Sequence, residues 1–308
     1  MGVYDIDGNP LSVSALIVNV KDFGAKGDGT TDDATAIQSA LDSLSTKGGI
    51  VFFPTGTYIV GSILYFYANQ KLVGDNAILK KSGSITAIIT SAGDTTITGY
   101  NGVHDCTFEG LTFDGNDTQV TPLSFCHAQR MTIRNCIFKK SASWHHLEVN
   151  SSKYVLIENC SFDASTKSAS SGETLQIDGF GASGNFPWEN GSADGTECKY
   201  VTVRDCNFYG QSASSDIGNH GGGGSYIEIT GCRFDGNTSE RGAIGFTGVG
   251  RYVNIHDNEF VGCTYGVSNS DRPALTVVHD NIFTGGTTPI VTSGIVKYNN
   301  FIDGVLTS

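Results

Sequence analysis

Short runs in which apolar and polar residues alternate recur along most of the chain. Alternation with a period of two is typical of a β-strand that buries one face. The clearest runs close at Phe113, Phe138, Phe162, Phe208, Phe234, Phe260, Phe283 and Phe301. Most of these phenylalanines are roughly 24 residues apart, which lies in the range of structural repeats. The pattern therefore predicts a solenoid in which each coil repeats the same strands.

A second, shorter alternating run precedes most of these strands. These runs are Leu147–Val149, Leu175–Ile177, Ile217–Asn219, Ile244–Phe246 and Tyr265–Val267. Two or three short strands per coil, stacked in register, describe a parallel β-helix, and parallel crossovers are right-handed. We expect an all-β, right-handed parallel β-helix. The wide gap between Phe162 and Phe208 is interpreted as one coil that carries an inserted loop over residues 179–197.

Small polar side chains occupy one fixed place in the repeat, two residues before the phenylalanine. They are Cys136, Cys160, Cys206 and Cys232, followed by Asn258, Asn281 and Asn299. A metal or redox site is one interpretation. An interior ladder is favoured, because free cysteine packs like a small hydrophobic residue and Asn amides can bond along the stack. Four cysteines lie off the ladder, and a disulfide among them stays open: Cys106, Cys126, Cys198 and Cys263.

The N-terminal part shows a different period. Residues 31–45 carry apolar side chains at positions 34, 37, 40, 41 and 44, which predicts an amphipathic helix. A solenoid needs a cover over its open end, so this helix is expected to cap the first coil. We expect residues 1–17 to form a linker and residues 18–308 to form a single β-helix domain.

The charge and composition narrow the classes of partner. The net charge is −12, which argues against a nucleic-acid-binding surface and against binding to anionic membranes. No apolar run approaches the length of a membrane span, and the residues after Met1 do not form a secretory signal. An extracellular or virion location would then require removal of the export signal or release by another route such as lysis.

Two segments carry a family resemblance. Residues 18–40 and 49–58 closely resemble the opening segment of the pectate-lyase superfamily. That superfamily includes single-stranded right-handed β-helix polysaccharide hydrolases and lyases and many phage tail-spike depolymerases. Residues 4–10 resemble linkers of phage-like proteins from Gram-positive bacteria. The resemblance implies a polysaccharide partner and, because phage spikes often trimerise, a possible homotrimer.

The candidate chemistry lies on the outward positions of the short strands. If Leu147, Leu175, Ile217 and Ile244 point inward, neighbouring outward rows bring together Glu148, Asp178, Asp216 and His220. With coils about 4.8 Å apart and alternate residues about 6.8 Å apart, these groups are expected within roughly 5–15 Å on one open face. Exposed acidic residues usually only solvate such a face, but the cluster beside a long loop favours a site.

Further residues are predicted to bind the substrate. Gly218 and Gly245 lack side chains and would form a floor for a flat sugar ring. Trp188 and Glu189 lie in the inserted loop and would wall the cleft. The remaining binding candidates are His146, Gln176 and Arg241.

Paired carboxylates are what glycoside hydrolysis requires, one as acid and one as base or nucleophile. Asp178 and Asp216 are the first pair, with Glu148 and Glu173 in reserve and His220 orienting Asp178. Gln176-Ile-Asp178 and Gly218-Asn-His220 partly resemble polygalacturonase motifs, but the adjacent Asp-Asp pair and the Arg-Ile-Lys motif of that branch are absent.

A glycoside hydrolase is therefore predicted first, with no cofactor and no resident metal. A polysaccharide lyase is the alternative; its base would be Lys or Arg, for which only Arg241 is placed, often with Ca²⁺. A non-catalytic glycan-binding spike is the third possibility.

Overall fold

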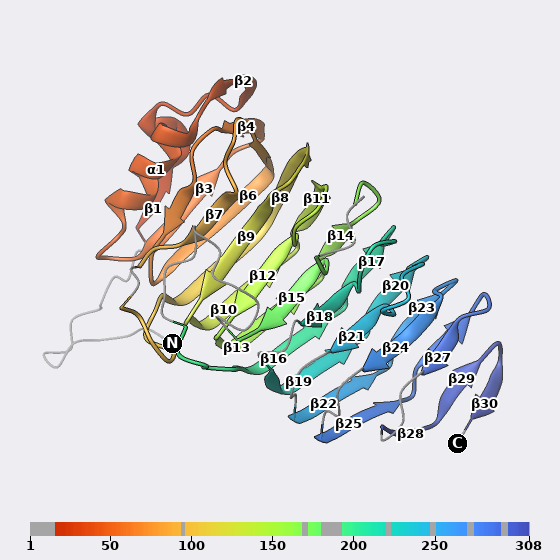
Figure 1. Ribbon diagram of the computed structural model, residues 1–308. Coiled ribbons are helices and arrows are strands. Elements are labelled where there is room, and N and C mark those ends of the chain that lie inside the picture. The colour runs from red at the N-terminus through yellow and green to blue at the C-terminus, as the bar shows by residue number, and fades with distance from the viewer. Residues whose placement is uncertain are drawn as a thin grey trace, which may run out of the picture.

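The computed structural model describes residues 16–93, 96–167, 172–179, 193–219, 223–246, 251–269, 274–290 and 295–307. In these ranges the chain winds into coils that stack along one axis, from the N-terminal helix to the last strands (Figure 1). Nearly all strand pairs are parallel, and the described part of the chain has a single α-helix. The predicted all-β parallel β-helix is confirmed.

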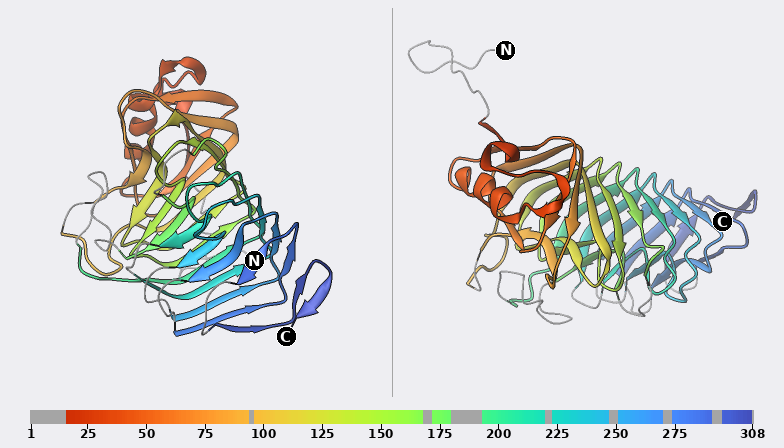
Figure 2. Two further views of the ribbon diagram at one scale, coloured as in Figure 1. Left: turned by 45° about the vertical axis from the view of Figure 1, so that its right-hand side comes forward. Right: turned by 90° about the horizontal axis from the view of Figure 1, so that it is seen from above.

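The strands form two sheets that run the length of the solenoid (Figures 1 and 2). The small sheet contains β5 (Leu64–Phe66), β7 (Ala87–Ser91), β9 (Thr121–Cys126), β12 (Leu147–Asn150), β15 (Leu175–Asp178), β18 (Ile217–Asn219), β21 (Ile244–Phe246), β24 (Tyr265–Asn269) and β27 (Thr288–Ile290). The large sheet begins with β1 (Ile17–Asn19), β2 (Asp28–Asp32), β3 (Gly49–Phe53), β4 (Gly56–Val60), β6 (Gln70–Lys81) and β8 (His104–Thr118).

In the later coils the large sheet receives two strands per coil. These are β10 (Gln129–Arg134), β11 (Ile137–Ser141), β13 (Lys153–Glu158), β14 (Ser161–Asp163), β16 (Cys198–Arg204), β17 (Asn207–Tyr209), β19 (Gly224–Thr230), β20 (Arg233–Asp235), β22 (Arg251–His256), β23 (Glu259–Val261), β25 (Ala274–His279), β26 (Ile282–Thr284), β28 (Val296–Tyr298) and β29 (Asn300–Ile302). The last strand, β30 (Val305–Thr307), turns back antiparallel to β29.

The interior is a stack of aromatic rings. Phe113, Phe138, Phe162, Phe208, Phe234, Phe260 and Phe283 are fully buried, with successive ring centres 4.6–5.1 Å apart. Phe162 pairs directly with Phe208, so the wide sequence gap between them is one coil with an insertion, as predicted. Because each ring contacts both neighbours, the stack fixes the register of every coil.

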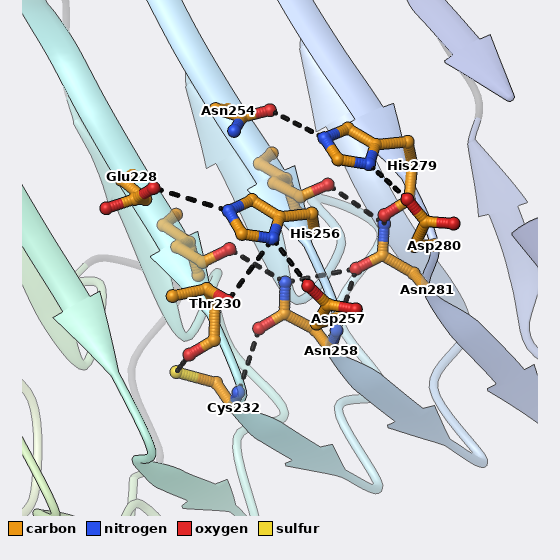
Figure 3. A network of polar contacts seen from close by, with 12 residues as sticks. Glu228, Thr230, Cys232, Asn254, His256, Asp257, Asn258, His279, Asp280 and Asn281 are labelled. Atoms are coloured by element: carbon orange, nitrogen blue, oxygen red, sulfur yellow. Dashed lines mark hydrogen bonds and ion pairs between the residues drawn. The ribbon is translucent and has the colours of Figure 1, made fainter. Parts of the chain in front are cut away.

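A polar ladder lies beside the phenylalanines. All eight cysteines are free and buried, including the predicted ladder of Cys136, Cys160, Cys206 and Cys232. Figure 3 shows where Asn continues it: Asn258 Oδ1 accepts the Cys232 backbone N–H at 2.9 Å. The Asn258 amide donates to Asn281 Oδ1 at 3.0 Å. Each amide thus satisfies backbone groups that the interior would otherwise leave without partners.

The last coil differs from the sequence prediction by one residue. The ladder continues from Asn281 to Asn300, whose Oδ1 accepts the Asn281 backbone N–H at 3.1 Å, and not to Asn299. Phe301 is 42% exposed, and Ile302 pairs with Phe283 instead. Two consecutive Asn residues are compatible with two registers, and in the observed one Ile302 packs against the core while Phe301 stays exposed.

Replacing the amide in the middle of the ladder is expected to destabilise the protein. Asn281→Leu removes the acceptor of the Asn258 N–H and the donor to the Ile255 carbonyl, both in the interior. We expect a loss of about 2–4 kcal/mol in the free energy of unfolding, since each buried unpaired group costs about 1–3 kcal/mol. Asn299→Gly is the control, because Asn299 is exposed at φ 53°. Equal thermal midpoints for the two variants would contradict the ladder.

The helix α1 (Ala34–Ser43) covers the N-terminal end, after the short 3₁₀ helix η1 (Val20–Phe23) (Figure 1). It is shorter than predicted, because Asp28–Asp32 pairs with β4 as strand β2. Ile37 and Leu41 are fully buried. The Gln38 side-chain amide bonds both the N–H and the carbonyl of Tyr65 in β5, at 2.8 and 3.1 Å. The helix therefore also supplies hydrogen bonds to the edge of the small sheet.

The predicted linker lies mostly outside the described residues, which begin at residue 16. No helix in the described ranges combines the length and the apolar character that a membrane span needs.

Candidate functional site

The outer row of the small sheet has the predicted register but not the predicted exposure. The strands β12, β15, β18 and β21 align Glu148, Gln176, Gly218 and Gly245 in one row. Glu148 and Asp178 are 0% exposed and Asp216 is 1% exposed. The prediction that these carboxylates lie on an open, solvent-facing surface is therefore wrong.

The segments that lead into the strands close this face. A Cβ on Gly218 would lie 2.8 Å from the Glu173 Cγ, and a Cβ on Gly245 would collide with the Ser215 hydroxyl. Gly218 and Gly245 are thus needed because residues just before β15 and β18 pack onto the outer side of the sheet. The predicted glycine floor for a sugar ring is wrong, since the protein's own side chains occupy that space.

A buried lysine lies at the centre of the closed face. Lys167 is 5% exposed and its ammonium donates to the carbonyl oxygens of Trp144, Gly172 and Glu173, the last two at 2.9 and 3.1 Å. Burial lowers the pKa of Lys167 from 10.5 to about 7, and the nearby carboxylates of Glu173 and Asp216 oppose this shift. Lys167 could not be predicted from the repeat pattern, because it lies after a turn, outside the alternating strands.

Asp216 is the carboxyl group most changed by this environment. Burial raises the pKa of Asp216 from 3.8 to about 7, against the opposing effects of a hydrogen bond from Asn237 and the charge of Lys167. The Asn237 amide lies 2.9 Å from Asp216 Oδ2. Asp216 is therefore substantially protonated near neutral pH, which is the state that a general acid needs.

Glu173 connects the closed face with the surface. Its Oε1 accepts the Ser214 hydroxyl at 3.2 Å and lies 3.7 Å from the Arg241 guanidinium. The ring Nδ1 of His145 lies 2.9 Å from the Glu173 carbonyl oxygen. Arg241 is half exposed, whereas Glu173 is 1% exposed. Glu173 and Asp216 are thus the two carboxylates whose charges act on Lys167, and the predicted partner Asp178 is not among them.

The other predicted residues of this face are also enclosed. Asp178 accepts the Gly179 backbone N–H at 2.8 Å and the Gln176 amide at 3.3 Å, both local contacts at the end of β15. His146 is 0% exposed, and burial followed by the charge of Lys167 lowers its pKa well below 6.5. Gln176 is 1% exposed. Substrate contact by His146 or Gln176 would require the face to open.

Three predicted site residues lie outside the described residues. They are His220, Trp188 and Glu189.

An exposed aromatic row runs along the large sheet and was missed by the sequence prediction. Tyr154, Tyr200, Tyr226 and Tyr252 stack with ring centres 4.8–5.0 Å apart and are 44–50% exposed. We call these four side chains the tyrosine row. Its signal was present in the sequence, because a tyrosine occupies the same place in four repeats, but alternation alone does not show which outward side chains remain exposed.

An open hollow lies at the N-terminal end of the tyrosine row. It has a volume of about 690 Å³, and its lining includes Lys71, Asp105, Thr107, Arg130, Tyr154 and Tyr200. Arg130 precedes Tyr154 in the same row of the sheet, and its Nε and Nη2 donate to the Asp105 carboxylate, each at 2.7 Å. The hollow therefore combines aromatic, hydroxyl and charged groups at the surface.

A second row, made of polar side chains, runs along the same sheet beside the tyrosine row. Arg134 bonds Glu109 at 2.7 Å and Arg204 bonds Glu158, which matches the charges in pairs. Further along, the rings of His256 and His279 stack 5.0 Å apart, and His256 contacts Glu228 at 3.3 Å (Figure 3). This row therefore offers many hydrogen-bonding groups but little net charge.

Comparisons with known proteins match nearly the whole chain. The model of a protein family described as rhamnogalacturonase A/epimerase, pectate lyase-like, matches residues 17–291. The curated "Plasmin and fibronectin-binding protein A" of Streptococcus pneumoniae is 31% identical over 242 residues, which are 66% of this chain and 33% of that protein. The chain thus spans about a third of the length of this relative.

Solved structures share the fold at low identity. The surface adhesin PfbA of Streptococcus pneumoniae superposes with a TM-score of 0.77 at 24% identity, over 93% of this chain and 78% of that chain. A hyperthermoactive exopolygalacturonase from Thermotoga maritima gives a TM-score of 0.57 at 14% identity, over 95% and 93% of the two chains. A surface adhesin and an exopolygalacturonase are therefore both similar in fold to this chain.

Proposed function

Because the chain belongs to the rhamnogalacturonase A/epimerase, pectate lyase-like family, a polysaccharide-active family of parallel β-helices, we propose that it is an extracellular or virion-borne glycan-binding protein. The observation that carries the proposal is the half-exposed tyrosine row that ends in an open hollow. Contiguous exposed aromatic surface marks binding sites, and tyrosine offers both an apolar ring and a hydroxyl. A surface adhesin among the similar structures supports this location.

The closed face of the small sheet favours binding over hydrolysis. A polysaccharide is cleaved only when an acid and a base or nucleophile both reach the glycosidic bond. Glu148, Asp178 and Asp216 are at most 1% exposed, so none of them offers an oxygen to a bulky chain as the protein stands. The tyrosine row, in contrast, is accessible along four coils.

The proposal predicts that a single tyrosine substitution weakens glycan binding. Tyr200→Ala should reduce affinity for a bound oligosaccharide about tenfold, since an aromatic contact contributes about 0.5–1.5 kcal/mol beyond its buried area. A glycan panel followed by isothermal titration calorimetry measures this. Tyr209→Ala is the matched control, because Tyr209 is 39% exposed on β17, outside the tyrosine row. Failure of every glycan to bind, or equal losses in both variants, would reject the proposal.

Glycoside hydrolysis is the second candidate, favoured by the raised pKa of Asp216 beside Glu173 and Lys167. Asp216 would act as the acid and Glu173 as its partner, once the face opens. Released reducing ends that fall at least 100-fold in Asp216→Asn would support it, in line with general acid–base contributions of about 10²–10⁴.

A lyase with Ca²⁺ would instead give unsaturated products that absorb ultraviolet light. Among the residues that the structure describes, no group of three or more His, Cys, Asp or Glu side chains is arranged to hold a metal ion.

A homotrimer remains a prediction, and light scattering of the purified protein tests it.

A further inference from the structure

The ion pair at the end of the tyrosine row leaves a gap in the stack. Arg130 occupies the place of a fifth tyrosine, but its guanidinium is held on the Asp105 carboxylate by two bonds of 2.7 Å. The side chains of Arg130 and Asp105 are 47% and 44% exposed. Arg130 Nη1 also donates to Gln129 Oε1 at 2.7 Å, and His104 Nδ1 lies 2.8 Å from Asp105 Oδ2. A bidentate pair held by such contacts fixes both groups in orientation, and their half-exposed edges face a ligand.

Tyr154 faces this gap as the last ring of the stack. Tyr200 lies 5.0 Å away, nearly parallel, on one side of the Tyr154 ring. On the other side the neighbouring place in the row belongs to Arg130, whose guanidinium binds Asp105. The Lys153 ammonium is 5.6 Å from the Tyr154 ring centre but nearer to the Tyr100 ring, at 4.6 Å. The inner tyrosines are stacked on both sides, so Tyr154 differs from them.

We propose that this hollow binds one neutral pyranose ring of a glycan, with the sugar face on Tyr154 and adjacent hydroxyl groups on the Arg130–Asp105 pair. The inference rests on the proposed function and specifies its ligand and subsite. The hydroxyls of Thr107 and Thr132 add donors and acceptors on the floor. The volume of about 690 Å³ falls within the range of small-molecule sites, about 300–1,000 Å³.

The charges favour a neutral sugar over an acidic one. Asp105 already matches the charge of Arg130, so the pair presents donors and acceptors without net charge. The whole chain carries a net charge of −12, which repels polyanions at a distance. Lys71 is the remaining cation in the lining, so its substitution tests an acidic ligand.

The length of the ligand distinguishes binding at this subsite, which needs only one or two sugar rings, from binding of longer glycans along the tyrosine row. We would titrate neutral monosaccharides, disaccharides and longer oligosaccharides, with uronic acids as the acidic arm, against the full chain. The variants are Arg130→Gln, Asp105→Asn, Tyr154→Ala and Lys71→Gln. Arg233→Gln is the matched control for Arg130, because Arg233 forms comparable surface pairs with Asp235 and Glu259. Tyr209→Ala is the control for Tyr154, because Tyr209 is 39% exposed on β17, outside the tyrosine row.

We expect a neutral disaccharide to bind and to lose at least tenfold in affinity in Arg130→Gln, Asp105→Asn and Tyr154→Ala. The two control variants and Lys71→Gln should stay within twofold, and melting curves should show all variants folded. Binding of long glycans alone, dependent on Tyr200 but not on Arg130, would overturn the subsite and leave the proposed function standing. Binding of no glycan would overturn both. Tighter, Lys71-dependent binding of uronic acids would overturn the neutral ligand.

Discussion

Lys167→Met should lower the free energy of unfolding by about 3 kcal/mol at pH 6, with a larger loss at pH 9. The substitution removes the donor to three carbonyl groups in the interior, of Trp144, Gly172 and Glu173, and unpaired buried groups cost about 1–3 kcal/mol each. The loss grows with pH because the native protein becomes more stable as the pH rises through the lowered pKa of Lys167. The variant has no such group and does not gain this stability.

The direction follows from proton binding. The pKa of Lys167 is about 7 in the folded protein and 10.5 in an unfolded chain. Between these values the unfolded chain holds a proton that the folded chain has released, so stability rises with pH, by on the order of 4 kcal/mol across the window. Urea unfolding at pH 6 and pH 9 measures the difference, with Lys47→Met at an exposed position as the control. A loss that does not change with pH would contradict the assignment.

Asp216→Asn should stabilise the protein relative to the native chain as the pH rises from 4 to 7. The folded pKa of about 7 exceeds the ordinary value of 3.8, so in this window the folded chain holds a proton that the unfolded chain has lost. Native stability from this group is therefore complete below pH 4 and is lost as the pH rises to 7, by on the order of 4 kcal/mol. Asn is neutral at every pH and escapes this loss.

Thermal midpoints of the two proteins at pH 4, 5.5 and 7 test this expectation. Asp303→Asn is the control, since Asp303 is exposed near the C-terminal end. A gain that is the same at all three pH values would show that Asp216 titrates normally and would also weaken hydrolysis as the second candidate.

The repeat made the coils predictable because period-two alternation and a phenylalanine in each coil leave one register for most strands. The pairing of Phe162 with Phe208 across the insertion is the clearest case. In the last coil the prediction of Asn299 as the ladder residue was wrong, because the sequence contains two adjacent asparagines and either one could continue the ladder. Only the fit of Ile302 and the exposure of Phe301 distinguish them.

The candidate site was predicted in position but not in exposure. Alternation shows which side of a strand a residue faces, but not what covers that side. Glu173 and Ser215 lie outside the alternating runs, in segments that cross the outer face and fill the space above Gly218 and Gly245. The tyrosine row escaped notice for the opposite reason, because its residues belong to the repeat yet remain exposed.

The crystal structure of the protein with an oligosaccharide selected from the glycan panel tests the central claim most directly. The account predicts sugar density on the large sheet, with one ring on Tyr154 beside Arg130, while the face that holds Glu173 and Asp216 stays closed. A sugar seated over β15 and β18, in contact with Glu173 and Asp216, would contradict the account and identify the carboxylate cluster as the working site.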